Sequence, residues 1–226
     1  MDGNRPTLGI APLLIFAFLT ACNSMPPAGS PSASPNPPGA SAVPAIPAPV
    51  PVALDARTSA LLILDIVTAN CPPNPACTAT VPAIASLLKR AREAKVPVIY
   101  SSFPRPAGPP APLAAVASRP GEPMVVGHAD KFMDTNLREL LKQRNATTLV
   151  IVGSAANGAV LYTSYHANAR GYTVVVAEDG ISSRAPFATL LTRYQLLNQP
   201  VFANPDNKPL AGKAVTLSRS DLITFH

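Results

Sequence analysis

Apolar residues beyond position 58 follow two alternating patterns. Some form short, nearly continuous runs, which are typical of strands buried on both faces. Others recur at helical spacing, as Ile84, Leu87, Leu88 and Ala91 do. The two patterns predict strands over 59–66, 96–100, 124–127, 148–153, 172–177 and 214–217, and helices over 81–94, 135–143, 159–170 and 187–197. Strands that alternate with helices favour an α/β fold with a parallel sheet covered on both faces.

The start of the chain follows neither pattern. Residues 8–21 form an apolar run that is shorter than the about 20 residues needed to span a bilayer, and it fits the hydrophobic region of a secretory signal. Cys22 follows Leu-Thr-Ala, and this sequence resembles the lipobox of bacterial lipoproteins, in which the Cys is lipidated. An ordinary signal with a chance Cys22 is the alternative. We expect a signal peptide over 1–21 and a lipid anchor at Cys22, with Asn23 favouring the outer membrane.

Residues 22–52 contain no charged side chain and hold ten of the chain's 28 prolines. Such a segment cannot bury a core and tends toward extended polyproline II structure. We expect a semi-rigid tether, with a proline-rich ligand for a partner as the alternative. The organisation is then a signal, a tether and one domain over 53–226, held on the bacterial cell envelope in the periplasm or at the surface.

The formal net charge of +6 falls within this domain, on basic residues that are scattered and not grouped in a run. No nucleic-acid-binding module is recognisable, so we expect no nucleic acid as a partner. The charge is then a solvated surface that could attract an anionic lipid or an anionic substrate. Oligomeric state is left open, a homo-oligomer included.

Candidate chemistry gathers where predicted strands end, because ligands of such sheets bind outside the carboxyl ends of the strands. Asp65 ends the first apolar run, and 153–158 follows the run over 148–153. Residues 178–180 follow the run over 172–177. We expect Asp65 to be a functional carboxylate, with a cap or turn residue as the alternative. Backbone N–H groups of the second segment could bind an oxyanion at the start of the next helix.

Two stretches carry a family resemblance. They are LLILDIV and VIVGSAANGAVLYTSYHANARGYTVVVAEDG, and together they resemble the isochorismatase-like hydrolase superfamily, which includes nicotinamidases and cysteine amidohydrolases. The resemblance covers nearly all of residues 58–220. It implies a three-layer α/β/α sandwich, Rossmann-like, with a mostly parallel six-stranded sheet, and a hydrolase that acts on a small-molecule substrate.

The family's catalytic residues are Asp, Lys and Cys, and the resemblance carries them over unevenly. Asp65 matches the Asp. Ala159 falls at the nucleophile position and Ala156 at the usual Thr, so cysteine amidohydrolase chemistry is excluded there, because alanine has no group that attacks a carbonyl. Lys131 is the nearest candidate for the Lys, and either it reaches the site or it lies in solvent.

The turn after the 148–153 run is the expected substrate-binding segment, through Gly153, Ala155, Asn157, Gly158 and Ala159. No metal is expected, because the Asp-x-His motif of nicotinamidases is absent and the three histidines are scattered. No cofactor is expected either.

Two cysteines, Cys71 and Cys77, lie shortly beyond Asp65. In an exported protein they favour a small disulfide that fixes the loop at the rim of the site. A relocated nucleophile at Cys71 is the alternative.

Two functions from different classes remain. True isochorismatases also lack the Cys, and there the Asp protonates the enol carbon of a vinyl ether before water adds. Apolar neighbours would raise the pKa of Asp65 and suit it to that role. The first function is therefore hydrolysis through Asp65 without a protein nucleophile. The second is a catalytically silent, lipid-tethered protein that binds a small molecule.

Overall fold

The computed structural model describes residues 44–226. The signal peptide, the lipidation site at Cys22 and most of the predicted tether lie outside the described residues.

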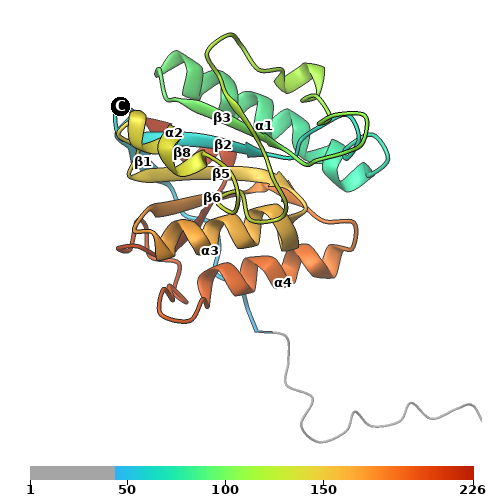
Figure 1. The fold of residues 1–226 in the computed structure, drawn as a ribbon. Coiled ribbons are helices and arrows are strands. Elements are labelled where there is room, and N and C mark those ends of the chain that lie inside the picture. Colours follow the sequence, from blue (N-terminus) through green and yellow to red (C-terminus); the bar gives the residue numbers. More distant parts are fainter. Residues whose placement is uncertain (1–43) are drawn as a thin grey trace, which may run out of the picture. The chain divides into compact units, whose positions relative to one another are not determined.

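One sheet organises the domain, and all its strand pairs are parallel. Its six strands lie in the order β4-β3-β2-β5-β6-β7 (Figure 1). The bounds are β2 Ser59–Leu64, β3 Val98–Ser102, β4 Met124–Val126, β5 Thr148–Ser154, β6 Thr173–Ser182 and β7 Val215–Ser218. All six residues of β2 are buried, as its continuous apolar pattern predicts for a strand with neighbours on both edges. The predicted α/β class is therefore confirmed, and the described sheet is wholly parallel.

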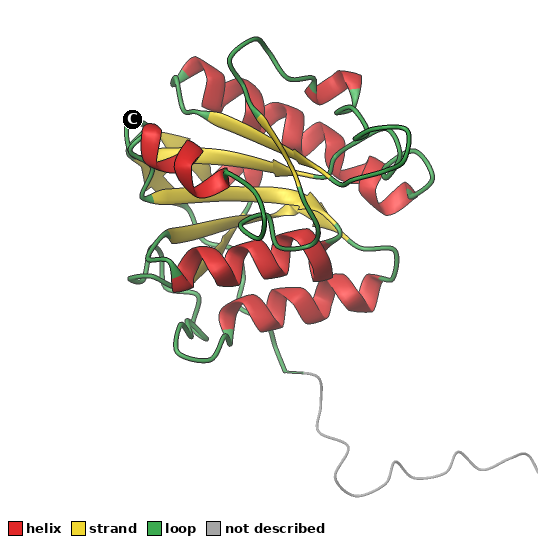
Figure 2. Cartoon of the chain, viewed as in Figure 1, coloured by secondary structure: helices red, strands yellow, loops and turns green. Residues whose placement is uncertain are grey.

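Helices cover both faces of this sheet and give three layers (Figures 1 and 2). Helix α1 (Pro75–Glu93) packs with one face, and the other face packs with α2 (Leu137–Gln143), α3 (Leu161–Ala169) and α4 (Pro186–Leu197). Alternate residues of each strand serve the two faces: Leu62 and Leu64 point into one core, and Leu61 and Ile63 into the other.

Two elements begin or end differently from the sequence prediction. Helix α1 begins at Pro75, and not near Val81, because proline suits the first helical position and the first-turn N–H groups need no intrahelical partner. Strand β6 continues to Ser182, and not to Ala177, after a register shift against β5. Residues 178–180, expected beyond a strand end, therefore lie within β6.

A second, two-stranded sheet joins the start and the end of the domain. Strand β1 (Val52–Leu54) pairs in parallel with β8 (Ile223–Phe225). Neither was predicted, because three residues are too few to show a period. The preceding residues also lie on the domain: the Val50 N–H donates to Leu217 O over 3.0 Å, and Asn207 Nδ2 donates to Ala48 O over 3.0 Å.

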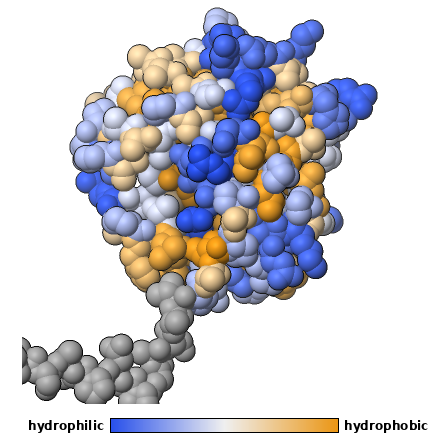
Figure 3. Space-filling model, turned by 180° about the vertical axis from the view of Figure 1, so that it is seen from behind, coloured by the Kyte–Doolittle hydropathy of each residue, from blue (hydrophilic) through white to orange (hydrophobic). Residues whose placement is uncertain are grey.

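Hydrophilic side chains are interspersed with smaller hydrophobic groups on the face shown in Figure 3. Among residues 44–226, no helix has the length and apolar character needed to cross a membrane.

Candidate active site

Asp65 lies just beyond the carboxyl end of β2, in the centre of the sheet. Its backbone has a φ of 56°, a left-handed conformation that turns the chain sharply away from the strand. Its carboxyl group is held on both oxygens. Ser101 Oγ donates to Oδ1 over 2.6 Å, and Lys131 Nζ lies 2.9 Å from Oδ2. Ser101 comes from the neighbouring strand β3, so the sheet itself places the two side chains together.

Lys131 reaches this carboxylate from the loop after β4 and is fully buried, with 0% of its surface exposed. Its ammonium group also donates to Gly127 O over 3.0 Å and contacts Ser102 O at 3.4 Å. The ammonium therefore has three oxygen partners, which satisfies a buried cation. Of the two alternatives left by the sequence, the structure shows the one in which Lys131 faces Asp65.

Helix α3 holds the loop that carries Lys131. The Lys131 N–H donates to Thr163 Oγ1 over 3.1 Å. Next to it, Asp130 Oδ2 lies 2.6 Å from His166 Nδ1, and Asp130 Oδ1 accepts from the Phe132 N–H over 2.9 Å. These contacts fix the backbone on both sides of Lys131.

Burial raises the pKa of the Asp65 carboxyl, while Lys131 and the Ser101 hydroxyl act in the opposite direction. The charged carboxylate loses hydration that two partners replace only in part. A carboxyl group of this kind keeps its proton to higher pH than an exposed aspartic acid. It can therefore donate a proton to a bound molecule.

The last residues of β5 and the turn that follows them lie beside the end of β2, where Gly153 pairs with Leu64. Gly153 has a φ of +155°, and a Cβ there would lie 2.4 Å from Leu64 O, so only glycine fits where the two backbones meet. The peptide bond between Ser154 and Ala155 is cis. Asn70 Nδ2 donates to both Asp65 O and Ser154 O, each over 3.0 Å, and so links the loop after β2 to this turn.

A π-helical turn over Ala156–Val160 then leads into α3. Ala159, at the position that the resemblance aligns with the nucleophile, is 3% exposed. The side chain of Asn157 is engaged elsewhere: its Oδ1 accepts from Ser183 Oγ over 2.8 Å. Gly158 shows no close backbone approach of the kind found at Gly153, since a Cβ there would meet only Ala155 Cβ, at 3.7 Å.

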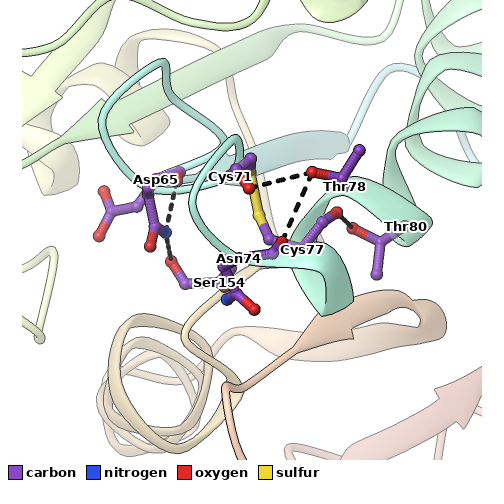
Figure 4. The surroundings of a disulfide bond; sticks show 8 residues. Asp65, Cys71, Asn74, Cys77, Thr78, Thr80 and Ser154 are labelled. Atoms are coloured by element: carbon purple, nitrogen blue, oxygen red, sulfur yellow. Dashed lines mark hydrogen bonds between the residues drawn. A yellow bond between two sulfur atoms is a disulfide. The ribbon is translucent and has the colours of Figure 1, made fainter.

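A disulfide joins Cys71, in the loop after β2, to Cys77, in the first turn of α1, and both residues are fully buried (Figure 4). Thr78 Oγ1 donates to Cys71 O over 3.0 Å, so the loop is tied to the first turns of α1 by this hydrogen bond as well as by the disulfide. Within the helix, Thr80 Oγ1 donates to Cys77 O over 2.8 Å. A sulfur in a disulfide is not a thiolate nucleophile. The alternative of a relocated nucleophile at Cys71 is therefore wrong for this structure.

The other sequence candidates lie apart from Asp65. Within residues 44–226, no group of three or more His, Cys, Asp or Glu side chains could hold a metal ion. His128 is exposed. Glu178 pairs with Arg193, and Asp179 accepts from Ser220, so both serve contacts of β6.

Sequence analysis did not identify Ser101, Asn70 or the Asp130–His166 pair. Ser101 could have been found by the rule used for Asp65, since it stands at the carboxyl end of the adjacent strand. The others depend on contacts between distant parts of the chain and left no local signal.

A family model described as the isochorismatase domain matches residues 59–201. The chain belongs to the isochorismatase family. The secreted isochorismatase effector Isc1 of Verticillium dahliae is 34% identical over 113 residues, which cover 46% of this chain and 60% of that protein. The match thus spans well under two thirds of the relative's length.

Several solved structures have the same fold. A cysteine hydrolase from Pseudomonas syringae has a TM-score of 0.63 at 18% identity, over 80% of this chain and 95% of that one. An isochorismatase family protein from Desulfovibrio vulgaris has a TM-score of 0.62 at 22% identity, over 73% and 95%. N-carbamoylsarcosine amidase from Thermoplasma acidophilum has a TM-score of 0.60 at 20% identity, over 73% and 97%.

Proposed function

We propose that this isochorismatase-family hydrolase cleaves a small molecule through Asp65, by general acid–base catalysis and without a protein nucleophile. The observation that carries the proposal is the buried cluster of Asp65, Lys131 and Ser101 at the carboxyl end of the sheet. The resemblance aligns Ala159 with the position of the attacking cysteine, which supports a reaction without a protein nucleophile. The chain therefore retains the groups that move a proton and lacks the group that would form a covalent intermediate.

The reaction that fits these groups best is hydrolysis of a vinyl ether. Protonated Asp65 gives its proton to the enol carbon, which leaves an oxocarbenium ion on the substrate and a carboxylate on the enzyme. Lys131, 2.9 Å from Oδ2, stabilises that new negative charge. Water adds to the cation and loses a proton, which returns to Asp65, and the hemiacetal-type adduct separates into a carbonyl compound and an alcohol.

The backbone turn around Gly153 supports substrate binding in this proposal. The Asn157 N–H donates to Ser183 Oγ over 3.3 Å and the Gly158 N–H donates to Ala155 O over 3.1 Å. The other N–H groups ahead of α3 are the ones proposed to meet the substrate, because the N-terminal end of a helix favours negatively charged groups. We therefore propose Gly153, Ala155, Asn157, Gly158 and Ala159 as the segment that borders the substrate, chiefly through backbone and small side chains.

The second candidate is a small-molecule-binding protein without catalysis. The tightness of the Asp65 cluster favours it: both carboxylate oxygens are already bonded, and Asp65 is only 7% exposed. A group held this firmly could serve structure alone.

We further propose that the chain is exported and held on a bacterial membrane by a lipid on Cys22, with the signal ending at residue 21. The support is the Leu-Thr-Ala-Cys sequence and the charge-free segment that follows it. The name of the Verticillium dahliae relative calls it secreted, which agrees with export. Labelling cells with a radioactive fatty acid tests this: the wild-type protein should take up label, and Cys22→Ala should not.

Turnover of a substrate panel separates the two functions. The purified protein is assayed on vinyl ethers, amides and esters, beside Asp65→Asn and a control, Asp55→Asn, at a half-buried carboxylate paired with the exposed Arg57. The proposal predicts turnover of a vinyl ether that falls by at least about a hundredfold in Asp65→Asn, the usual scale for loss of a general acid. No turnover on the panel would favour the binding protein.

A further inference from the structure

A cavity lies on the same edge of the sheet as Asp65, beyond the end of β6. Its volume is about 330 Å³, enough for a small organic acid. Its polar wall consists of Ser182 and Ser183 at the end of β6 and of Thr189 and Arg193 on α4. Ala76, in the first turn of α1, closes one side. None of these residues belongs to the Asp65 cluster.

Ser182 is the unexplained residue of this wall. It is 4% exposed, and its hydroxyl has no hydrogen-bond partner among residues 44–226. Its neighbours are engaged: Ser183 Oγ donates to Asn157, and Thr189 Oγ1 accepts from the Ser183 N–H over 2.9 Å. A buried hydroxyl without a partner is costly, so this one is expected to meet a group that the cavity binds.

Apolar side chains complete part of the wall, and the remaining groups around the cavity carry positive charge or partial positive charge. Helix α1 is 19 residues long, has no acidic residue in its first turn, and Asn74 at its N-cap makes no side-chain capping bond. Pro75 has no N–H, and the Cys77 N–H donates to Asn74 O over 2.9 Å. The Ala76 N–H is therefore the backbone donor that this first turn offers to a ligand. Arg193 adds a guanidinium group whose Nε is buried without a partner.

One acidic group lies next to these positive groups and would weaken the binding of an anion. Glu178 Oε2 lies 2.5 Å from a terminal nitrogen of Arg193. Burial raises the pKa of Glu178, although Arg193 acts in the opposite direction. In the part of the chain that the structure describes, Nε of Arg193 has no hydrogen-bond partner, so an anion would share Arg193 with Glu178.

We propose that this cavity binds the anionic group of a small molecule, a carboxylate or a phosphate, through Ser182, Arg193 and the N-terminal end of α1. The hydrogen bond from Ser183 to Asn157 connects the cavity to the turn that borders the Asp65 site. Strands β2 and β6 are separated only by β5, so the two sites lie on the order of 10 Å apart at the usual strand spacing. An elongated organic anion could reach both.

This inference deepens the proposed function by making the substrate an organic anion. The statement about the substrate rests on the proposed function, whereas the binding of an anion in the cavity does not depend on it. The two are therefore tested by separate measurements.

The test is an NMR titration of the purified protein with three probes: succinate, inorganic phosphate and neutral succinamide. Succinate or phosphate should bind with shifts centred on Ala76, Ser182 and Ser183, and succinamide should not bind. The preferred probe decides between a carboxylate and a phosphate. Absence of binding by both anions, or shifts centred on other residues, would overturn the inference.

Two variants with matched controls locate the contacts. Ser182→Ala should raise Kd roughly tenfold, the usual effect of losing one hydrogen bond to a charged group. Ser59→Ala is its control, because Ser59 is also buried without a partner for its hydroxyl but lies at the opposite end of the sheet, in β2. Arg193→Gln should abolish binding, whereas Arg57→Gln, on the surface, should not change it. Equal affinity in Ser182→Ala and Ser59→Ala would contradict the assignment.

Asp65→Asn separates this inference from the proposed function. It should bind the anion as the wild type does. If the wild type and Asp65→Asn both bind the anion and neither turns over any substrate, the hydrolase proposal fails and the anion site remains. If the wild type turns over a substrate but binds neither anion, the hydrolase proposal holds and the anion site is overturned.

Discussion

The two sides of the candidate active site differ in what holds them together. On the Asp65 side, side chains form a closed network: Asp65 contacts Ser101 and Lys131, and Lys131 has no exposed surface. On the Ala159 side, the backbone conformation at Gly153 and in the π-helical turn determines where the residues of the site lie. The first side should therefore be sensitive to charge, and the second to backbone conformation and volume.

Loss of the buried cation should have the largest effect. Lys131→Met leaves the Asp65 carboxylate buried beside an apolar chain, and we expect unfolding free energy to fall by about 3–5 kcal/mol. Urea unfolding measures this. The control is Lys89→Met, in the exposed pair with Glu93, which should cost less than about 0.5 kcal/mol. Equal losses in the two variants would mean that the Asp65 side gains nothing from its buried charge pair.

Gly153→Ala tests the backbone side. The Cβ of the introduced alanine would lie 2.4 Å from Leu64 O, and the backbone has a φ of +155°. The steric overlap and the strain of the backbone conformation therefore both lower the stability. We expect a loss of about 2–4 kcal/mol in the free energy of unfolding. Gly108→Ala is the matched control, because Gly108 also has a positive φ, +91°, but has open space around it. Gly108→Ala should therefore cost only about 1 kcal/mol, from the backbone conformation alone.

The pH dependence of stability should distinguish the buried carboxyl from an ordinary paired one. The folded-state pKa of Asp65 is raised by burial, so between the unfolded and folded pKa values the folded protein binds more protons than the unfolded chain. Its contribution to stability is then full below the unfolded pKa and is lost as pH rises through the folded pKa. The difference in unfolding free energy between wild type and Asp65→Asn should therefore decrease as pH rises.

Glu122 provides the opposite case. Burial acts to raise its pKa, but hydrogen bonds from Arg92 and Arg119 outweigh burial, and the pKa is lowered. Its contribution is present above the unfolded pKa and is lost as pH falls through the folded pKa. The difference between wild type and Glu122→Gln should therefore decrease as pH falls. If Asp65→Asn showed that same sign, the network around Asp65 would outweigh its burial.

The sequence predicted the Asp65 side only in part. Asp65 could be found because it ends a continuous apolar strand, and such strands mark the ligand-binding edge of a parallel sheet. The position of Lys131 could not, because it depends on the path of an irregular loop held by Thr163 and His166, more than 30 residues further along the chain. The six strands of the main sheet were predicted from short apolar runs, although in β4 only the middle residue is buried.

The anion cavity was beyond prediction for a related reason. Sequence analysis ended the apolar run at Ala177, whereas β6 continues through a register shift to Ser182. The prediction therefore put Glu178 to Gly180 at the edge of the sheet, whereas in the structure Ser182 and Ser183 lie there. A register shift depends on the neighbouring strand, and the sequence of one strand does not show it.

The smallest effect on stability is expected at Ala159, where the two sides of the site can be made to work together. Ala159→Cys adds one sulfur atom at a position that is 3% exposed, and we expect it to change the unfolding free energy by only about 1 kcal/mol. If Asp65 and the turn after β5 form one site, the introduced thiol should become reactive, because Asp65 can take its proton and the turn can stabilise an oxyanion.

Mass spectrometry after incubation with small amides and esters should show an acyl adduct on this variant. The adduct should be absent from Ala79→Cys, at an exposed position of α1, and should form more slowly when Asp65→Asn is combined with Ala159→Cys. Equal rates of adduct formation with and without Asp65→Asn would mean that the carboxyl does not act on this position, and that the two sides do not form one catalytic site.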